Sequence, residues 1–241
     1  MSVVEVIKAI NSSDVADRGA VELAQFIRKL QSKQERIDVA LTGGSVGILT
    51  LKHFAEKTDL SELDLNRVHF WFGDERYVAL HSPDRNANQA RESMLSKLGI
   101  SPSNVHEFPA ADSGLTVSQA AEVFESELAT ELGSESMDFM FLGMGTDGHV
   151  ASLFPGHQYP DSVIVSEENS PKPPDQRLSM SYGFINRSKE IVFVVSGIDK
   201  SEAILDVHKN IHSELPAAKI RASEKTLWII DAAAGAAFWS C

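Results

Sequence analysis

An acid and a histidine stand two residues apart in a glycine-rich segment near the middle of the chain. Asp147 and His149 belong to the run LGMGTDGH, which directly follows the apolar run DFMFL. Histidine titrates near neutral pH and a neighbouring carboxylate can orient its ring, so the pair has the usual equipment of a general base. A lone histidine is more often structural, but a glycine-flanked turn after a predicted strand favours a role in proton transfer.

The same segment also has the spacing of a dinucleotide-binding fingerprint. Three glycines, the second of which is Gly145, follow the pattern G-x-G-x-x-G. Such a fold needs a full helix opening at the third glycine, whereas Pro155 would end a helix begun at His149 after about two turns. Asp147 would also face the pyrophosphate with a negative charge. We therefore disfavour a dinucleotide and expect Gly145 to shape a substrate-binding loop.

A second glycine turn joins a predicted strand to a predicted helix. It consists of Thr42, Gly43, Gly44 and Ser45. Glycine lets the backbone turn tightly, and the helix N-terminus offers free N–H groups and the positive end of its dipole. The turn lacks the lysine and the spacing of a Walker loop, so it does not indicate a nucleoside triphosphate. An ordinary tight turn would look the same, but we expect these residues to bind an anion.

Charged residues follow another buried strand, VHFWF. Asp74 and Arg76 belong to the run GDERY, and their place at the end of a strand suits positioning of a substrate or stabilisation of developing charge. A solvated charged loop is the competing interpretation. Two further cations, Arg177 and Lys200, lie at the ends of other predicted strands. Charge-assisted bonds to phosphate contribute roughly 1.5–3 kcal/mol each, so with the loop amides these cations would select a phosphorylated ligand.

Other reactive residue types do not assemble into a recognisable site. His208 and His212 have the spacing of a zinc pair, but no H-E-x-x-H pattern or third ligand accompanies them, and we expect a solvated helix face. Ser152 lacks the G-x-S-x-G context of a nucleophilic serine. The single cysteine, Cys241, is the last residue, which argues against a catalytic thiol. We expect no metal and no organic cofactor.

The composition is that of a globular protein. Of 241 residues, 43% are apolar and 23% are charged, and the net charge of −12 leaves no basic face for a nucleic acid. An anionic ligand must therefore bind at a local basic island. The N-terminus does not resemble a signal peptide, and the longest apolar run, IVFVV, is far too short to span a bilayer. We expect a cytoplasmic monomer or weak homo-oligomer without nucleic-acid or membrane partners.

Predicted strands and helices alternate along the chain, which favours an α/β fold with a doubly wound, mostly parallel sheet and helices on both faces. Such a sheet binds ligands beyond the carboxyl ends of its strands. A proline-rich stretch at residues 167–176 is expected to be an exposed loop within a single domain spanning residues 1–241. The predicted helices are one capped by Asp14 and those at residues 45–56, 86–98 and 117–128. The predicted strands are residues 36–42, 68–72, 138–142, 162–165, 178–181, 190–195 and 226–231.

Several of these segments together resemble the 6-phosphogluconolactonase family. LGMGTDGHVASLFPGH is similar to the signature of that family, LTGGS to its phosphate loop and WFGDERYV to its acidic motif. VVSGIDKSEAIL, LPAAKI and LWIIDAAA resemble its C-terminal third, so the resemblance covers almost the whole chain. It implies the Rossmann-like fold of the phosphosugar isomerases and deaminases. It also implies cofactor-free hydrolysis of 6-phospho-D-glucono-1,5-lactone in the oxidative pentose phosphate pathway.

The resemblance and the loop chemistry together imply a role for each candidate residue. His149 would deprotonate the water that attacks the lactone carbonyl, and Asp147 would orient His149. Arg76 and loop amides would stabilise the oxyanion, while Asp74 would position water or contact sugar hydroxyls. The phosphate would be held by Gly43, Gly44, Ser45, Arg177 and Lys200.

Two departures from the family pattern and one rival family bear on this interpretation. The family's loop usually continues as G-G-S-T-P, whereas Val46 and Gly47 follow Ser45 here, and Arg85 stands where a serine is common, which adds a charge near the site. Glucosamine-6-phosphate deaminase has a similar loop but carries a glutamate at the position of Phe154, which cannot relay a proton. A deaminase-like or isomerase-like enzyme and a non-enzymatic phosphosugar sensor are the alternatives.

Overall fold

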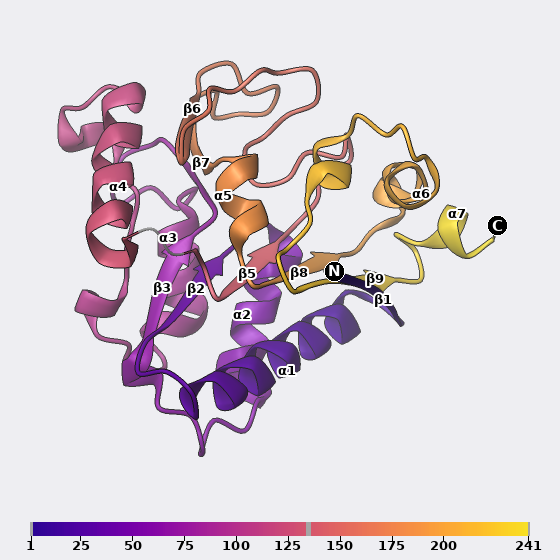
Figure 1. The fold of residues 1–241 in the computed structure, drawn as a ribbon, viewed down its shortest axis with the longest axis horizontal. Helices are drawn as coiled ribbons and strands as arrows, with labels where there is room; N and C mark the ends of the chain where they lie inside the picture. Colours follow the sequence, from indigo (N-terminus) through magenta and orange to yellow (C-terminus); the bar gives the residue numbers. More distant parts are fainter. Residues whose placement is uncertain (1, 134–135, 241) are drawn as a thin grey trace.

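Parallel strands form the main sheet of the molecule (Figure 1). The computed structural model describes residues 2–133 and 136–240, and within them the sheet has six strands in the order β1-β9-β8-β5-β2-β3. Every neighbouring pair is parallel, which confirms the predicted parallel sheet. In sheet order the strands are β1 (Val3–Ala9), β9 (Lys225–Asp231), β8 (Glu190–Val195), β5 (Phe139–Leu142), β2 (Ile37–Leu41) and β3 (Val68–Phe72).

Helices cover both faces of this sheet. Strands β2 and β5 are buried along their whole length, as strands covered on both faces should be. Figure 1 shows α1 (Ser12–Gln31) and α2 (Ser45–Lys57) on one side, and α4 (Val117–Leu132), α5 (Tyr182–Arg187) and α6 (Ser201–Lys209) on the other. The remaining helices are α3 (Asn86–Ala90), which continues as a π-helical turn over Arg91–Leu95, and α7 (Ala236–Trp239).

The start of α1 differs from the prediction. The side chain of Asn11 caps the helix by accepting the N–H of Asp14 at 3.0 Å. Asp14 lies inside the first turn and accepts the N–H of Ile10 at 2.8 Å. The predicted cap was wrong by three residues because Asn and Asp both cap helices, and one of each flanks this turn.

A second sheet was not predicted. Its three antiparallel strands follow the order β4-β7-β6, with bounds β4 (Asp74–Arg76), β7 (Arg177–Met180) and β6 (Ile164–Glu167). The strands expected at residues 162–165 and 178–181 are therefore present, slightly shifted, but they do not join the parallel sheet. A parallel neighbour needs a crossover of a dozen or more residues, whereas only a short loop joins β6 to β7.

The first and last strands of the described chain are neighbours in the main sheet. The unpredicted edge strand β1 pairs with β9 from Val3 opposite Lys225 to Ala9 opposite Asp231. Within residues 2–133 and 136–240, no helix has both the length and the apolar character needed to cross a bilayer. Cys241 lies outside the described residues.

Candidate active site

Three loops meet at the carboxyl edge of the main sheet. They follow β5, β2 and β3, which are neighbours in that order, and they begin at Gly143, Thr42 and Gly73. Because parallel neighbours end at the same edge, the loops close on one pocket of about 490 Å³, its open mouth included. The lining residues are Thr42, Gly43, Gly44, Asp74, Arg76, Asn86, Gly143, Met144, Gly145, His149, Ala151 and Arg177.

Most of the predicted site residues line this pocket, and three do not. Asp147 contacts the pocket through His149, and Ser45 opens α2 directly after Gly44. Lys200 ends the 3₁₀ turn Ile198–Lys200 after β8, and its Nζ lies 3.5 Å from Oδ1 of Asp199. The structure therefore brings the acid–histidine pair, the glycine turn and two arginines together, and leaves Lys200 outside the lining.

Asp147 and His149 form a close hydrogen-bonded pair. Oδ1 of Asp147 lies 2.5 Å from Nδ1 of the His149 ring. Bonding at Nδ1 fixes the orientation of an imidazole and leaves Nε2 as the atom that can exchange a proton. A Cβ at Gly145 would overlap Nδ1 of His149, so this position needs a glycine to admit the pair.

The electrostatics of the pair favour an ionised carboxylate. Burial tends to raise the pKa of Asp147, but the hydrogen bond and charge of His149 outweigh it and hold the pKa well below its usual range. Lys172 acts in the same direction, with its Nζ 3.8 Å from Oδ1 of Asp147. Asp147 is therefore a fixed negative charge beside the imidazole.

Asp74 is held by a partner that the sequence did not suggest. Its Oδ2 accepts the hydroxyl of Ser152 at 2.7 Å, and Ser152 is fully buried. The Nδ2 group of Asn86 donates to the main-chain oxygen of Asp74 at 2.9 Å. Asp74 is 7% exposed, so these bonds fix a nearly buried carboxylate in the pocket wall.

The glycine turn depends on its two glycines for different reasons. Gly44 has φ of +79°, in the left-handed region that favours glycine. Gly43 does not have a positive φ, but a Cβ there would overlap the carboxamide of Asn86. Gly47 lets the first turn of α2 approach Thr42, because a Cβ would lie 2.8 Å from Cγ2 of Thr42. The departure at Gly47 thus tightens packing behind the loop.

Arg177 lines the pocket and also holds its neighbouring loop. Its guanidinium donates to the carbonyl oxygens of Lys172, Pro173 and Pro174 at 3.0, 3.0 and 3.2 Å. The loop at residues 168–176 is mostly exposed, as expected, but Lys172 in it lies against the site, with its Nζ 3.8 Å from Oδ1 of Asp147. Lys172 was missed because an exposed loop gave no reason to place it at the site, although a lysine in a proline-stiffened loop was a usable signal.

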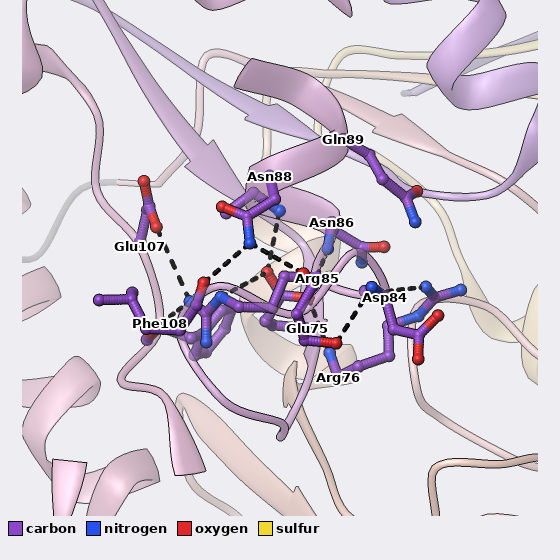
Figure 2. Close-up of polar contacts among 12 residues, drawn as sticks. Glu75, Arg76, Asp84, Arg85, Asn86, Asn88, Gln89, Glu107 and Phe108 are labelled. Atoms are coloured by element: carbon purple, nitrogen blue, oxygen red, sulfur yellow. Dashed lines mark hydrogen bonds and ion pairs between the residues drawn. The ribbon is translucent and has the colours of Figure 1, made fainter. Parts of the chain in front are cut away.

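Arg85 brings a charge near the site, as expected, but it lies behind the pocket and is not among the lining residues. It is fully buried, and its Nη2 donates to the carbonyl of Phe108 at 2.7 Å and lies 3.8 Å from Glu107 (Figure 2). Its Nε lies 3.9 Å from Oε2 of Glu75. Arg85 is thus placed between two carboxylates behind the site.

Histidines elsewhere make contacts within the protein. His208 packs against the rings of Trp228 and Phe238, and burial lowers its pKa to about 4, so the expected solvated helix face was wrong for this residue. His69 and His106 lie near Glu131, but their facing ring nitrogens are 3.0 Å apart with ring centroids at 5.3 Å. Those distances describe an in-line N–H···N bond, and we assign no metal to this group.

The parallel sheet, the glycine turn and the acid–histidine pair at its carboxyl edge define an α/β protein with a polar pocket beyond the ends of its strands. The sequence model of the family described as glucosamine-6-phosphate isomerases/6-phosphogluconolactonase matches residues 10–228. The chain belongs to that family.

Individual relatives agree with this assignment. A 6-phosphogluconolactonase of Mycobacterium leprae is 35% identical over 236 residues, covering 94% of this chain and 95% of the relative. The crystal structure of 6-phosphogluconolactonase from Thermotoga maritima has a TM-score of 0.83 and 28% identity, covering 95% of this chain and 100% of the other. A monomeric glucosamine-6-phosphate deaminase shares the fold alone, with a TM-score of 0.79 at 20% identity, covering 97% of this chain and 98% of the other.

Proposed function

We propose that this chain hydrolyses 6-phospho-D-glucono-1,5-lactone to 6-phosphogluconate in the oxidative pentose phosphate pathway. The observation that carries the proposal is the hydrogen-bonded pair of Asp147 and His149, which opens on the pocket shared by the Gly43–Gly44 turn and the two arginines. The pair suits hydrolysis of an ester, and the turn and arginines suit a phosphorylated substrate. The names of the relatives support the same substrate.

The proposed reaction needs only groups that the chain supplies. Nε2 of His149 takes a proton from a water molecule as the water oxygen bonds to the lactone carbonyl carbon, and Asp147 stabilises the imidazolium. Arg76 stabilises the negative charge that develops on the carbonyl oxygen. When the bond between that carbon and the ring oxygen breaks, His149 returns the proton to the ring oxygen. Asp74 positions the water or contacts sugar hydroxyls.

Phe154 favours a lactonase over a deaminase. Its side chain is 1% exposed, and its ring centroid lies 4.7 Å from that of His149. An apolar ring thus stands beside the imidazole at the position where the deaminase resemblance requires a glutamate. A non-enzymatic sensor would bind a phosphosugar without a reaction, so it would not need the hydrogen-bonded pair of Asp147 and His149. We further propose a cytoplasmic enzyme, a monomer or weak homo-oligomer, that works without a metal.

One assay separates these functions. Purified protein is mixed with freshly made 6-phosphogluconolactone, and acid release above the spontaneous rate is recorded, with glucosamine-6-phosphate turnover measured in parallel. Rapid lactone hydrolysis without ammonia release is expected, and the rate should be unchanged after EDTA treatment and dialysis. Ammonia release would indicate a deaminase, binding without turnover a sensor, and loss of activity with EDTA a metal enzyme.

A further inference from the structure

Glu75 lies in the chain between the pocket residues Asp74 and Arg76 but does not line the pocket itself. It is fully buried in β4, and its carboxylate accepts three main-chain N–H groups (Figure 2). Oε1 accepts those of Arg76 at 2.8 Å and Asn86 at 2.7 Å, and Oε2 accepts that of Ala87 at 2.9 Å. One carboxylate therefore ties the strand that carries Arg76 to the segment that carries Asn86.

The hydrogen bonds that Glu75 accepts take the place of a side-chain cap on helix α3. Helix α3 has five residues, and its N-cap, Arg85, makes no side-chain capping bond. The first N–H groups of a helix have no partner within it, and here Glu75 accepts those of Asn86 and Ala87. Arg85 places a positive charge 3.9 Å from the same carboxylate. The start of α3 is thus fixed by a residue eleven positions earlier in the chain.

The side chain of Asn86 carries this constraint to the glycine turn. Its Nδ2 donates to the main-chain oxygen of Asp74, and a carbonyl oxygen can only accept, so the amide orientation is determined. Oδ1 then points the other way, into the space that a Cβ on Gly43 would occupy. It has no hydrogen-bond partner among the described residues. The carboxamide is therefore wedged between β4 and the turn.

We propose that Glu75 is a positioning residue that acts through Asn86 to set the anion-binding turn at Gly43 relative to Asp74 and Arg76. The inference rests on the proposed function, because it assumes that the turn holds the phosphate while β4 acts at the lactone. The phosphate and the lactone carbonyl of the substrate are a fixed distance apart, so turnover requires the turn at Gly43 and strand β4 to be held at a fixed position relative to each other.

A double-mutant cycle tests the contact between Asn86 and Gly43. Gly43→Ala should lower kcat/KM by roughly tenfold or more, the size expected when an added methyl overpacks a fixed neighbour. The same change should cost almost nothing in the Asn86→Ala background. An equal loss in both backgrounds would overturn the proposal. Gly44→Ala is the matched control, since its penalty comes from its φ of +79° and should be the same in both backgrounds.

A third background tests whether Glu75 acts through Asn86. In Glu75→Ala the start of α3 is released, so Asn86 can move aside and the loss caused by Gly43→Ala should shrink. Glu75→Gln keeps one carbonyl oxygen to accept the N–H groups of Arg76 and Asn86. In this background Gly43→Ala should again lower kcat/KM almost as much as in the wild type. A merely structural role for Glu75 would leave the loss at Gly43 unchanged in both variants, and that result would overturn the proposal.

Melting temperatures of the same variants separate this inference from the proposed function. The coupling between Gly43 and Asn86 should appear as a smaller drop in Tm for Gly43→Ala when Asn86 is replaced, and no substrate is needed to observe it. If the wild type fails to hydrolyse the lactone, the proposed function is overturned while the Tm cycle still decides the contact. If the effects of Gly43→Ala and Asn86→Ala were additive both in Tm and in kcat/KM, the proposed coupling between Gly43 and Asn86 would be overturned.

Discussion

Oδ1 of Asp147 lies 2.5 Å from Nδ1 of His149, and this contact leaves Nε2 as the ring nitrogen that can exchange a proton. The contact exists because Gly145 has no side chain to obstruct it. Gly145, Asp147 and His149 of the same loop thus depend on one another for this arrangement. The role of this arrangement in proton transfer can be tested one residue at a time.

Replacing His149 should remove the base while leaving the binding groups in place. General-base catalysis typically contributes about 10²–10⁴-fold, so His149→Ala should lower kcat by that order. Affinity for 6-phosphogluconate, measured by calorimetry, should stay close to that of the wild type. His212→Ala, which removes an exposed histidine, is the matched control. Near-wild-type turnover by His149→Ala would show that the base has been assigned wrongly.

Asp147→Asn should impair catalysis and change the response to acid. The amide cannot stabilise the imidazolium as a carboxylate does, so kcat should fall nearly as far as in His149→Ala. The pKa of Asp147 is lowered in the fold from its ordinary value of 3.8. Its stabilising effect is therefore full above that value and lost as pH falls through the lower, folded value.

Thermal melting between pH 2 and 7 measures this effect of Asp147. The Tm difference between wild type and Asp147→Asn should shrink in strong acid, as the carboxylate of Asp147 becomes protonated. Across pH 5–9, Asp147 should contribute no inflection to the activity profile, because it remains ionised throughout. A difference in Tm that grew as the pH fell below about 3.8 would contradict the lowered pKa.

Strands could be predicted wherever their own residue pattern was sufficient to identify them. Runs such as VHFWF and IVFVV mark strands that are apolar because both sheet faces are covered, and β3 and β8 have the predicted bounds. Strand β1 escaped because most of its residues are exposed or only partly buried, so its pattern is mixed. The second sheet escaped because periodicity identifies strands but not their partners. Only the short β6–β7 connection pointed to antiparallel pairing.

The site was predictable where chemistry and position coincided in one motif. Asp74, Arg76 and His149 all follow strands that end at the same edge, and they line one pocket. Asn86 was missed because its importance lies in contacts with Asp74 and Gly43, which are remote in sequence. Such contacts leave no local signal.

Burial of Glu75 should make the stability of the protein depend on pH near neutrality. Burial raises the pKa of Glu75 to about 7, although the charge of Arg85 and the N–H groups of Ala87, Asn86 and Arg76 favour ionisation. Because the folded value exceeds the ordinary 4.5, protonation stabilises the fold. This stabilisation is full below about pH 4.5 and is lost as the pH rises through 7.

Comparison with Glu75→Gln isolates this titration, because the glutamine side chain carries no ionisable proton. The Tm of the wild type relative to Glu75→Gln should fall between pH 5 and pH 8. Most other groups titrate alike in both proteins, so their effects cancel in the difference. Parallel Tm curves over this interval would show that Glu75 does not titrate there.

Arg177 and Lys200 should differ in what their replacement does, although both were predicted to hold phosphate. Nζ of Lys200 lies 3.5 Å from Oδ1 of Asp199, and Lys200 lies outside the pocket lining. If it nevertheless reaches the phosphate, Lys200→Ala should raise KM and spare kcat, because phosphate binding is largely uniform between ground and transition states. Hydrogen exchange of the loop at residues 168–176 should not change in this variant.

Arg177→Lys should instead loosen that loop, because a lysine cannot reproduce the fork of donors that bonds the carbonyls of Lys172, Pro173 and Pro174. Lys172 lies 3.8 Å from Asp147, so a looser loop should disturb the catalytic pair as well as phosphate binding. The expected result is a lower kcat, a higher KM and faster hydrogen exchange at residues 168–176. A rise in KM alone, with unchanged exchange, would mean that Arg177 acts on the phosphate and not through the loop.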